Sequence, residues 1–322
     1  MKKTIITGVT GQTGSWLAEN LLNEDHKVYG LMRRSSHFND NNIKGIMSNP
    51  NLDLSYGDLT DSSSINKLVN EIKPDYFYNL GAMSFVKASF DIPEYTFDVD
   101  AAGVIRVLEA IRNFSPKTRF LQASTSELYG NSPPPQSELT PFEPRSPYGV
   151  AKLAAYWAVK NYREAYKLFA CNAISFNHEG TRRSEHFITR KVTRAACRIS
   201  VGLQDKLVLG NLASKRDFLD ARDVCKGQQI ILEAEKADDF VIASGVAISM
   251  QQFVEKVFSK LNLDHSKYVE ISEKYFRPTE VDHLCGDPSK IKSVLGWEQL
   301  ISFDQMVDDM VNHDLELAKK EL

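Results

Sequence analysis

Tyr148 and Lys152 stand four residues apart, a spacing that places two side chains on the same face of a helix. An ammonium group beside a phenol favours the phenolate and lowers the pKa of the phenol. We therefore expect Tyr148 to be a base that accepts a proton from a substrate hydroxyl. The same spacing is also typical of an ordinary helix surface, so its meaning depends on the rest of the chain.

A second candidate base, Glu127, lies in the run Ser124-Thr125-Ser126-Glu127. Hydride transfer from an alcohol needs only one base. Two separate bases therefore indicate a reaction with an additional proton abstraction.

The N-terminus carries three glycines at a regular spacing, Gly8, Gly11 and Gly14, between a short apolar run and a helical pattern. The first permits a tight turn, the second lets the backbone approach a pyrophosphate, and the third allows close packing of helix and strand. The spacing Gly-x-x-Gly-x-x-Gly is a variant of the dinucleotide fingerprint. An ordinary glycine-rich turn is the alternative interpretation.

The second β-type run ends at Arg33-Arg34-Ser35-Ser36, where NAD-binding folds usually place an acidic residue for the ribose hydroxyl. Two guanidinium groups and two hydroxyls suit a 2′-phosphate better than a bare ribose. The segment therefore favours NADP over NAD as the cofactor. A solvated basic loop is the alternative.

The overall composition excludes several classes of protein. The chain has 322 residues, a net charge of −3 and no basic tail, so we expect no nucleic-acid binding. The apolar runs are too short for a membrane helix, and Met1 leads directly into the first strand, so we expect a cytoplasmic protein. Neither the four scattered cysteines nor the seven histidines show metal-ligand spacing, so we expect no metal site and no disulfide framework.

Strand and helix patterns alternate through the first half, which predicts an α/β fold with a doubly wound parallel sheet and a smaller C-terminal α/β lobe. The expected strands are 4–7, 27–32, 52–56, 75–80, 119–124 and 169–174, and the expected helices are 12–23, 62–72, 96–113 and 149–166. Later elements are helices at 188–201, 220–234 and 249–261, strands at 206–209 and 239–243, and two final helices. We assign 1–175 and roughly 217–245 to the NADP-binding domain, and 176–216 and 246–322 to a sugar-nucleotide-binding lobe.

Several chemically informative residues follow directly after predicted strands: Gly8, Arg33, Asp58, Gly81 and Thr125. Ligands of doubly wound sheets bind beyond the carboxyl ends of the strands. We therefore expect these residues to line one crevice.

Taken together, these motifs resemble the extended short-chain dehydrogenase/reductase superfamily and, within it, the GDP-mannose 4,6-dehydratase family. The resemblance covers nearly the whole chain. Its most specific pieces are the segments 33–36, 56–61, 78–82, 122–130, 145–149, 176–179 and 277–282.

The resemblance implies a mechanism for the four catalytic candidates. Tyr148 deprotonates the sugar 4-hydroxyl while hydride passes from C4 to NADP⁺, Lys152 keeps Tyr148 ionised, and Thr125 hydrogen-bonds the reacting oxygen. Glu127 removes the C5 proton, water leaves from C6, and the hydride returns to C6. The product is a 4-keto-6-deoxy sugar, and the cofactor ends as it began.

The resemblance also implies binding residues and an assembly. The expected cofactor contacts are Gly8, Gly11, Gln12, Thr13, Gly14, Arg33, Ser35, Ser36, Asp58, Leu59, Leu80, Ala82, Ser84, Tyr95, Lys152, His178 and Arg183. The expected contacts to the GDP-sugar are Ser84, Glu127, Tyr148, Asn177, Lys191, Arg216 and Arg277. A structural role for His178, and surface positions for Lys191 and Arg216, are the alternatives. We expect a homodimer or homotetramer in which the segment 33–36 reaches a neighbouring subunit's cofactor.

Three departures from the family pattern keep the substrate open. Met83 and Phe85 stand where the family usually has Gln and His, Gly180 begins a stretch where Ser-Pro is usual, and Phe218-Leu219-Asp220 replaces Trp-Gly-His. A GDP-heptose 4,6-dehydratase and a GDP-4-keto-6-deoxymannose reductase are therefore alternatives. An NADP-sensing scaffold without activity would not need Thr125 and Glu127 as well as the Tyr/Lys pair.

Overall fold

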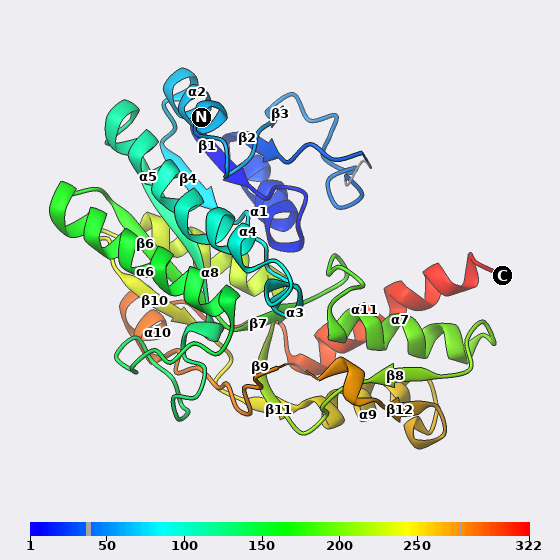
Figure 1. Cartoon of the computed structure of the whole chain (residues 1–322). Coiled ribbons are helices and arrows are strands. Elements are labelled where there is room, and N and C mark those ends of the chain that lie inside the picture. The colour runs from blue at the N-terminus through cyan, green and yellow to red at the C-terminus, as the bar shows by residue number, and fades with distance from the viewer. Residues whose placement is uncertain (37–39, 277) are drawn as a thin grey trace.

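The computed structural model describes residues 1–36, 40–276 and 278–322, and its largest element is a seven-stranded sheet (Figure 1). The strand order is β10-β6-β5-β4-β1-β2-β3, and all neighbouring strands are parallel. The strands are β1 (Lys2–Thr7), β2 (His26–Met32), β3 (Leu52–Tyr56), β4 (Tyr76–Asn79), β5 (Arg119–Thr125), β6 (Ala170–Ser175) and β10 (Asp239–Ile242). The order reverses between β1 and β4, so the ligand crevice of a doubly wound sheet lies there. The predicted fold class and these seven strands are confirmed.

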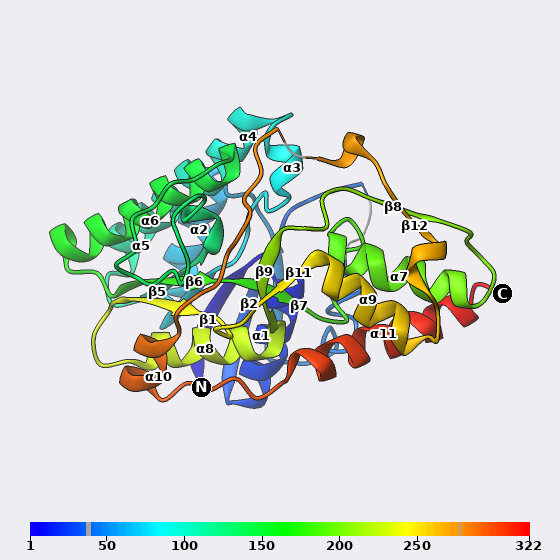
Figure 2. The same ribbon diagram turned by 90° about the horizontal axis from the view of Figure 1, so that it is seen from below.

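Helices cover both faces of this sheet (Figures 1 and 2). On one face lie α1 (Gln12–Asn23) and α8 (Ala221–Glu233), and on the other lie α2 (Ser62–Ile72), α5 (Gly103–Phe114) and α6 (Pro147–Tyr166). Successive residues of a strand point to opposite faces, so Ile5 and Ile6 enter two different apolar clusters although both are fully buried.

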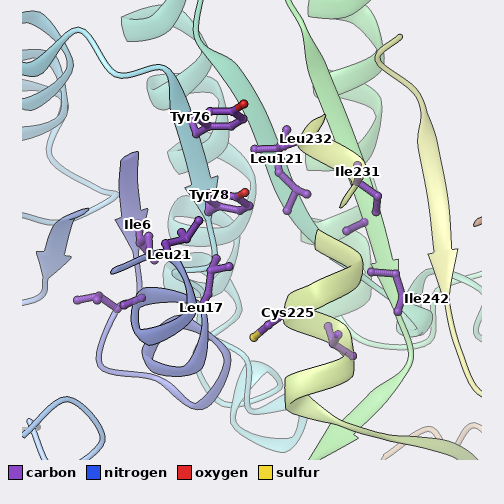
Figure 3. Packing of buried hydrophobic residues seen from close by; sticks show 14 of the residues in the cluster. Ile6, Leu17, Leu21, Tyr76, Tyr78, Leu121, Cys225, Ile231, Leu232 and Ile242 are labelled. Carbon is purple, nitrogen blue, oxygen red and sulfur yellow. The ribbon is translucent and has the colours of Figure 1, made fainter. Parts of the chain in front are cut away.

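The cluster between the sheet and the α1–α8 pair is shown in Figure 3. Leu17 and Leu21 of α1 pack toward Ile6 and Tyr78, and Cys225 and Ile231 of α8 cover the neighbouring part of the sheet. Close packing of this kind fixes the strand ends, and with them the residues that follow each strand.

The helix expected at 96–113 is present but is not one regular helix. It consists of α4 (Pro93–Phe97), a π-helical segment (Asp98–Ala102) and α5. A wider turn of this kind is frequent at functional sites. The 3.6-residue spacing of apolar residues, from which the helix was predicted, does not reveal it. The short helix α3 (Val86–Ser89), which precedes α4, was also not expected.

The C-terminal half adds a second group of elements beside the sheet (Figures 1 and 2). The helices α7 (Ile188–Ser200), α9 (Met250–Lys260) and α11 (Phe303–Lys319) share an apolar cluster, and α10 (Ser289–Leu295) packs on β10 and α8. Two small sheets pair β8 (Leu207–Leu209) with β12 (Val269–Ile271), and β9 (Lys215–Asp220) with β7 (Asn177–Glu179) and β11 (Ala247–Ser249). Short 3₁₀ turns occupy Ser126–Leu128, His265–Lys267 and Glu273–Tyr275.

The sequence predicted α7, α8, α9, β8 and β10 at nearly the observed bounds, but it did not predict β7, β9, β11 or β12. The missed strands are short, and their pairing is set by contacts between distant segments. The division into two domains stays a prediction.

Within the described parts of the chain, no helix is long and apolar enough to cross a membrane. The same parts contain no group of three or more His, Cys, Asp or Glu side chains placed to hold a metal ion. The cytoplasmic location stays a prediction.

Candidate active site

Two cavities meet at the crevice between β1 and β4. The larger, of about 600 Å³, extends from the end of β5 and the start of α6 to the C-terminal lobe. The smaller, of about 460 Å³, lies over the ends of β2 and β3. Gly8, Gly11, Leu80, Phe85 and Phe187 line both cavities, so the two form one groove.

The glycine turn at the centre of this groove requires glycine at two of its three positions. Gly8 has a φ of +69°, and a Cβ on Gly14 would lie 2.2 Å from the Gly8 carbonyl oxygen. Gly11 caps α1 without a side-chain hydrogen bond, so the first turn of the helix has no side-chain acceptor at its cap. These features fit the diphosphate of a dinucleotide, which such turns bind through backbone N–H groups.

The start of α6 positions Tyr148 and Lys152. Pro147 suits the first helical position, and the Ser146 hydroxyl accepts a hydrogen bond of 3.0 Å from the Gly149 amide. Tyr148 and Lys152 then lie one turn apart, only 7% and 3% exposed, and both line the larger cavity. The Lys152 ammonium donates to the Ala123 carbonyl at 3.0 Å and lies 5.8 Å from the centre of the Tyr148 ring.

Thr125 and Glu127 reach the same cavity from the carboxyl end of β5. The Thr125 hydroxyl accepts a hydrogen bond of 3.2 Å from the Glu127 amide and begins a 3₁₀ turn, and this turn buries the Glu127 side chain at the cavity wall. The Thr125 side chain also interacts with Tyr148 and favours its ionised form. The structure thus brings together the four residues predicted to be catalytic.

The expected lowering of the Tyr148 pKa is wrong for this structure. Burial raises the pKa of Tyr148, and the Asp100 and Glu127 carboxylates raise it further, whereas the hydrogen bond with Thr125 and the charge of Arg183 lower it. Burial also lowers the pKa of Lys152, against the effect of Asp100. The physical reason is that the loss of hydration of a fully buried phenolate outweighs the nearby favourable interactions.

Asp100 is a residue that the sequence analysis missed. It lies in the π-helical segment and is 1% exposed. Its Oδ1 accepts a hydrogen bond of 2.7 Å from the Met83 amide, and its buried Oδ2 has no hydrogen-bond partner among the described residues. Burial raises the pKa of Asp100, whereas the charge of Lys152 lowers it. The sequence did carry one signal for Asp100, namely a carboxylate within a largely apolar helical segment.

His178 has both ring nitrogens engaged within the protein. Nδ1 is 2.9 Å from the Phe176 carbonyl oxygen, and Nε2 is 3.0 Å from the Thr13 hydroxyl. Burial and the charge of Arg183 lower the pKa of His178 to about 4, so the ring is neutral at neutral pH. A carbonyl only accepts, so Nδ1 donates to Phe176 and Nε2 accepts from Thr13. This bonding holds the glycine turn against β7 and supports the structural interpretation of His178.

The other end of the groove is basic and open to solvent. The exposed Arg33 donates a hydrogen bond of 2.6 Å to the Tyr95 hydroxyl, and the Arg34 guanidinium lies 5.7 Å from the centre of the Tyr56 ring. Asp58 accepts hydrogen bonds of 2.9 Å from both the amide and the hydroxyl of Thr60, so its carboxylate also shapes the local turn.

The residues predicted for the GDP moiety lie in the far part of the larger cavity. Lys191 donates a hydrogen bond of 2.7 Å to the Val208 carbonyl and lies 4.2 Å from the centre of the Tyr275 ring. Arg216, on β9, is 6% exposed, and Asn177 begins β7. Tyr275 was not predicted. Arg277 lies outside the described residues.

Most of the predicted binding residues line one or both cavities. In the larger cavity these are Gly8, Gly11, Gln12, Thr13, Gly14, Leu80, Ala82, Ser84, Glu127, Tyr148, Lys152, Asn177, His178, Arg183, Lys191 and Arg216. The smaller cavity adds Arg33, Ser35, Asp58, Leu59 and Tyr95. Ser36 lines neither cavity.

A parallel seven-stranded sheet, a glycine turn at its switch point and a Tyr/Lys pair on α6 define an enzyme fold of the extended short-chain dehydrogenase/reductase type. Solved structures share this fold. A dTDP-glucose 4,6-dehydratase from Bacillus anthracis in complex with NAD superposes with a TM-score of 0.87 at 21% identity, covering 99% of this chain and 98% of that one. The RMD protein of Pseudomonas aeruginosa complexed with NADPH gives 0.82 at 22% identity, covering 98% of this chain and 100% of that one.

The sequence comparisons are more specific. A family model described as GDP-mannose 4,6 dehydratase matches residues 5–310. The chain is 51% identical to GDP-mannose 4,6 dehydratase 2 of Arabidopsis thaliana, with 99% of this chain and 88% of the relative covered. It is 46% identical to the human GDP-mannose 4,6 dehydratase, with 98% and 92% covered. The chain therefore belongs to the GDP-mannose 4,6-dehydratase family, and the resemblance inferred from its motifs is confirmed.

Proposed function

We propose that the chain converts GDP-mannose to GDP-4-keto-6-deoxymannose by removing one molecule of water. The observation that carries this proposal is the presence of two separate bases, Tyr148 and Glu127, in one cavity with Thr125 and Lys152. The names of the curated relatives support the substrate.

Tyr148 and Glu127 divide the proton transfers between them. Tyr148 accepts the proton of the 4-hydroxyl as C4 becomes a ketone, and Thr125 hydrogen-bonds the same oxygen. The ketone acidifies C5, whose proton passes to Glu127. Glu127 then protonates the departing 6-hydroxyl, so that the C6–O bond breaks and water leaves. As hydride returns to C6, C5 regains one proton from solvent. Tyr148 then releases to solvent the proton that it took from the 4-hydroxyl, so that both bases return to their starting state.

Lys152 supports this chemistry by its charge. Its ammonium opposes the cost of a buried phenolate at Tyr148, and Asp100 in turn favours the charged form of Lys152. A nicotinamide cofactor held along the glycine turn would supply the acceptor for hydride from C4 and the donor of hydride to C6.

NADP is the cofactor that the open end of the groove suits. Arg33 and Ser35 line the smaller cavity, and both side chains are exposed. A guanidinium donates paired hydrogen bonds to phosphate oxygens. The 2′-phosphate of NADP offers such oxygens, and the bare ribose of NAD does not.

The GDP moiety of the substrate is assigned to the far part of the larger cavity. Lys191 and Arg216 supply positive charge there, and Asn177 supplies an amide. Arg277 is proposed for the same role from its motif alone.

A homodimer or homotetramer is part of the proposal. Val150 and Trp157 lie two turns apart on one face of α6, and both are exposed. Phe97 and Ile105, on the neighbouring α4 and α5, are exposed as well. A surface with several large apolar side chains is typical of a subunit interface. Light scattering should give a mass above the 36.3 kDa of one chain.

The proposal is tested by incubating the protein and NADP⁺ with a panel of GDP-, dTDP-, UDP- and CDP-sugars, including a GDP-heptose. We expect GDP-mannose to yield a product lighter by one water, with solvent hydrogen at C5 and no net change in NADPH. Preferred turnover of the heptose would instead establish a GDP-heptose 4,6-dehydratase. Stoichiometric NADPH consumption with a 4-keto sugar would instead establish a reductase.

A further inference from the structure

Two aromatic rings meet where the two cavities join. Phe85 caps α3 in the connection after β4, and Phe187 caps α7 in the C-terminal half. Their ring centroids are 5.8 Å apart at an interplanar angle of 67°, an edge-to-face contact. Both residues line both cavities, as Gly8 and Gly11 of the glycine turn do.

From this position we infer that Phe85 and Phe187 form a clasp that holds the nicotinamide cofactor in the groove between the two hydride transfers. The clasp, defined as these two side chains, connects the sheet side of the groove to the C-terminal side. A dinucleotide held along the glycine turn would pass this point, because Gly8, Gly11, Phe85 and Phe187 line both cavities. Its release would then require the rings to separate or the chain around them to move.

Arg183 and the residues that it contacts support the Phe187 ring. The Arg183 guanidinium lies 3.5 Å from the centre of the Phe187 ring, a cation–π contact. Arg183 is itself fixed by an ion pair of 3.1 Å with the buried Glu179, which also accepts a hydrogen bond from Thr189. The Phe187 ring is therefore supported by a buried polar network.

The Phe85 side has a second connection across the groove. Lys87, two residues further along the chain, donates a hydrogen bond of 2.9 Å to the Lys274 carbonyl and lies 5.2 Å from the centre of the Tyr275 ring. The start of α3 is thus tied to the C-terminal half at two points.

The proposed reaction gives such a clasp a purpose, and the inference rests on that proposal for its role in turnover. The hydride removed from C4 is the one that C6 needs later. If the reduced cofactor leaves between these steps, the sugar remains oxidised at C4 and receives no hydride at C6. Slow cofactor release therefore favours completed dehydration, unlike in an enzyme that exchanges its cofactor every cycle.

The first measurement needs no sugar. NADPH bound to the full-length protein is displaced with excess NADP⁺, and its release is followed by fluorescence in a stopped-flow instrument. We expect Phe85→Ala and Phe187→Ala to speed release about 2- to 10-fold, the range that corresponds to one aromatic pair. The double variant should release NADPH more slowly than the product of the two single effects predicts, because the singles remove the same contact.

Matched variants separate the clasp from general damage. Phe85→Tyr retains a ring and should release NADPH at nearly the original rate. Phe85→Leu retains bulk without a ring and should release NADPH at a rate similar to that of Phe85→Ala. The leucine variant replaces the alanine variant in the test if the latter does not fold. Ile92→Ala removes another exposed apolar side chain from the same region, one that lines neither cavity, and should leave release unchanged.

The second measurement counts reduced cofactor that appears free in solution for each dehydrated GDP-mannose. We expect this ratio to rise in the two alanine variants and to stay near its original value in Ile92→Ala. Unchanged release of NADPH in folded Phe85→Ala and Phe187→Ala proteins would overturn the clasp. If GDP-mannose is not dehydrated, the proposed function fails, while the release measurement still decides on the clasp.

Discussion

The two ends of the groove are built in opposite ways. At the end with Tyr148 and Lys152, the functional groups are buried and are held by secondary structure on both sides. At the end with Arg33 and Ser35, the side chains are exposed on a connection that follows β2. Chemistry that shifts protons is placed where hydration is excluded, and recognition of a charged group is placed where arginine remains hydrated until a ligand binds.

The difference has an energetic reason. A buried ionisable group costs free energy unless nearby groups compensate for its charge, so the buried end depends on several mutually supporting residues. An exposed arginine stays hydrated, so its charge depends much less on compensating neighbours. Substitutions at the buried end should therefore affect rate and pH dependence, and substitutions at the exposed end should affect cofactor choice.

The largest effect should come from Tyr148→Phe, which removes the phenolic oxygen that accepts the proton of the sugar 4-hydroxyl. We expect dehydration of GDP-mannose to slow on the order of 10²- to 10⁴-fold, the usual contribution of one acid–base group. Single-turnover absorbance should show no reduced cofactor either, because C4 oxidation fails. Rates near those of the unaltered protein would remove Tyr148 from the mechanism.

A similar loss, confined to one step, should follow Glu127→Gln. Elimination should slow by a comparable factor, on the order of 10²- to 10⁴-fold. C4 oxidation should still occur, so reduced cofactor should accumulate in a single turnover while no water is lost. Dehydration by Glu127→Gln at the original rate would show that another group takes the C5 proton.

At the exposed end, Arg33→Ala should change affinity and not chemistry. One charge-assisted hydrogen bond contributes about 1.5–3 kcal/mol, so the Kd for NADP⁺ should rise about 10- to 100-fold. The Kd for NAD⁺ should change little, because that cofactor has no 2′-phosphate. Titration calorimetry measures both, and an equal loss for the two cofactors would argue against a phosphate contact.

The smallest effect should be a shift in pH dependence in Asp100→Asn. The asparagine keeps an acceptor for the Met83 amide but removes a negative charge. That charge raises the pKa values of both Tyr148 and Lys152. Without it, both pKa values fall. If activity needs ionised Tyr148 and protonated Lys152, the whole profile of kcat against pH moves to lower pH.

The control for this variant is Asp98→Asn in the same π-helical segment. Asp98 is partly exposed and pairs with Arg106 at 2.7 Å, outside both cavities. Its removal should leave the pH profile in place and cost at most about 1 kcal/mol of stability, as exposed ion pairs do. Two other charged groups, Glu127 and Arg183, also act on Tyr148, and both are unchanged in the two variants. A profile that does not move in Asp100→Asn would show that its charge does not reach the site.

The sequence by itself determined the sheet, the glycine turn and the four catalytic candidates. Local signals suffice for these: apolar strand runs mark β1 to β6, and a four-residue spacing aligns Tyr148 with Lys152. The start of α6 was expected at residue 149, and the structure places it at Pro147. The parallel order then brings Thr125 and Gly8 to one edge of the sheet, because the carboxyl ends of parallel strands meet there.

Only the tertiary structure decided the electrostatics and the contacts across the groove. The pKa of Tyr148 rises because burial, which no spacing reveals, outweighs the nearby favourable interactions. Asp100 becomes part of the site through a π-helical turn, and Phe85 meets Phe187 although about one hundred residues separate them. Burial and long-range contacts depend on how distant segments pack, and local residue patterns do not predict that packing.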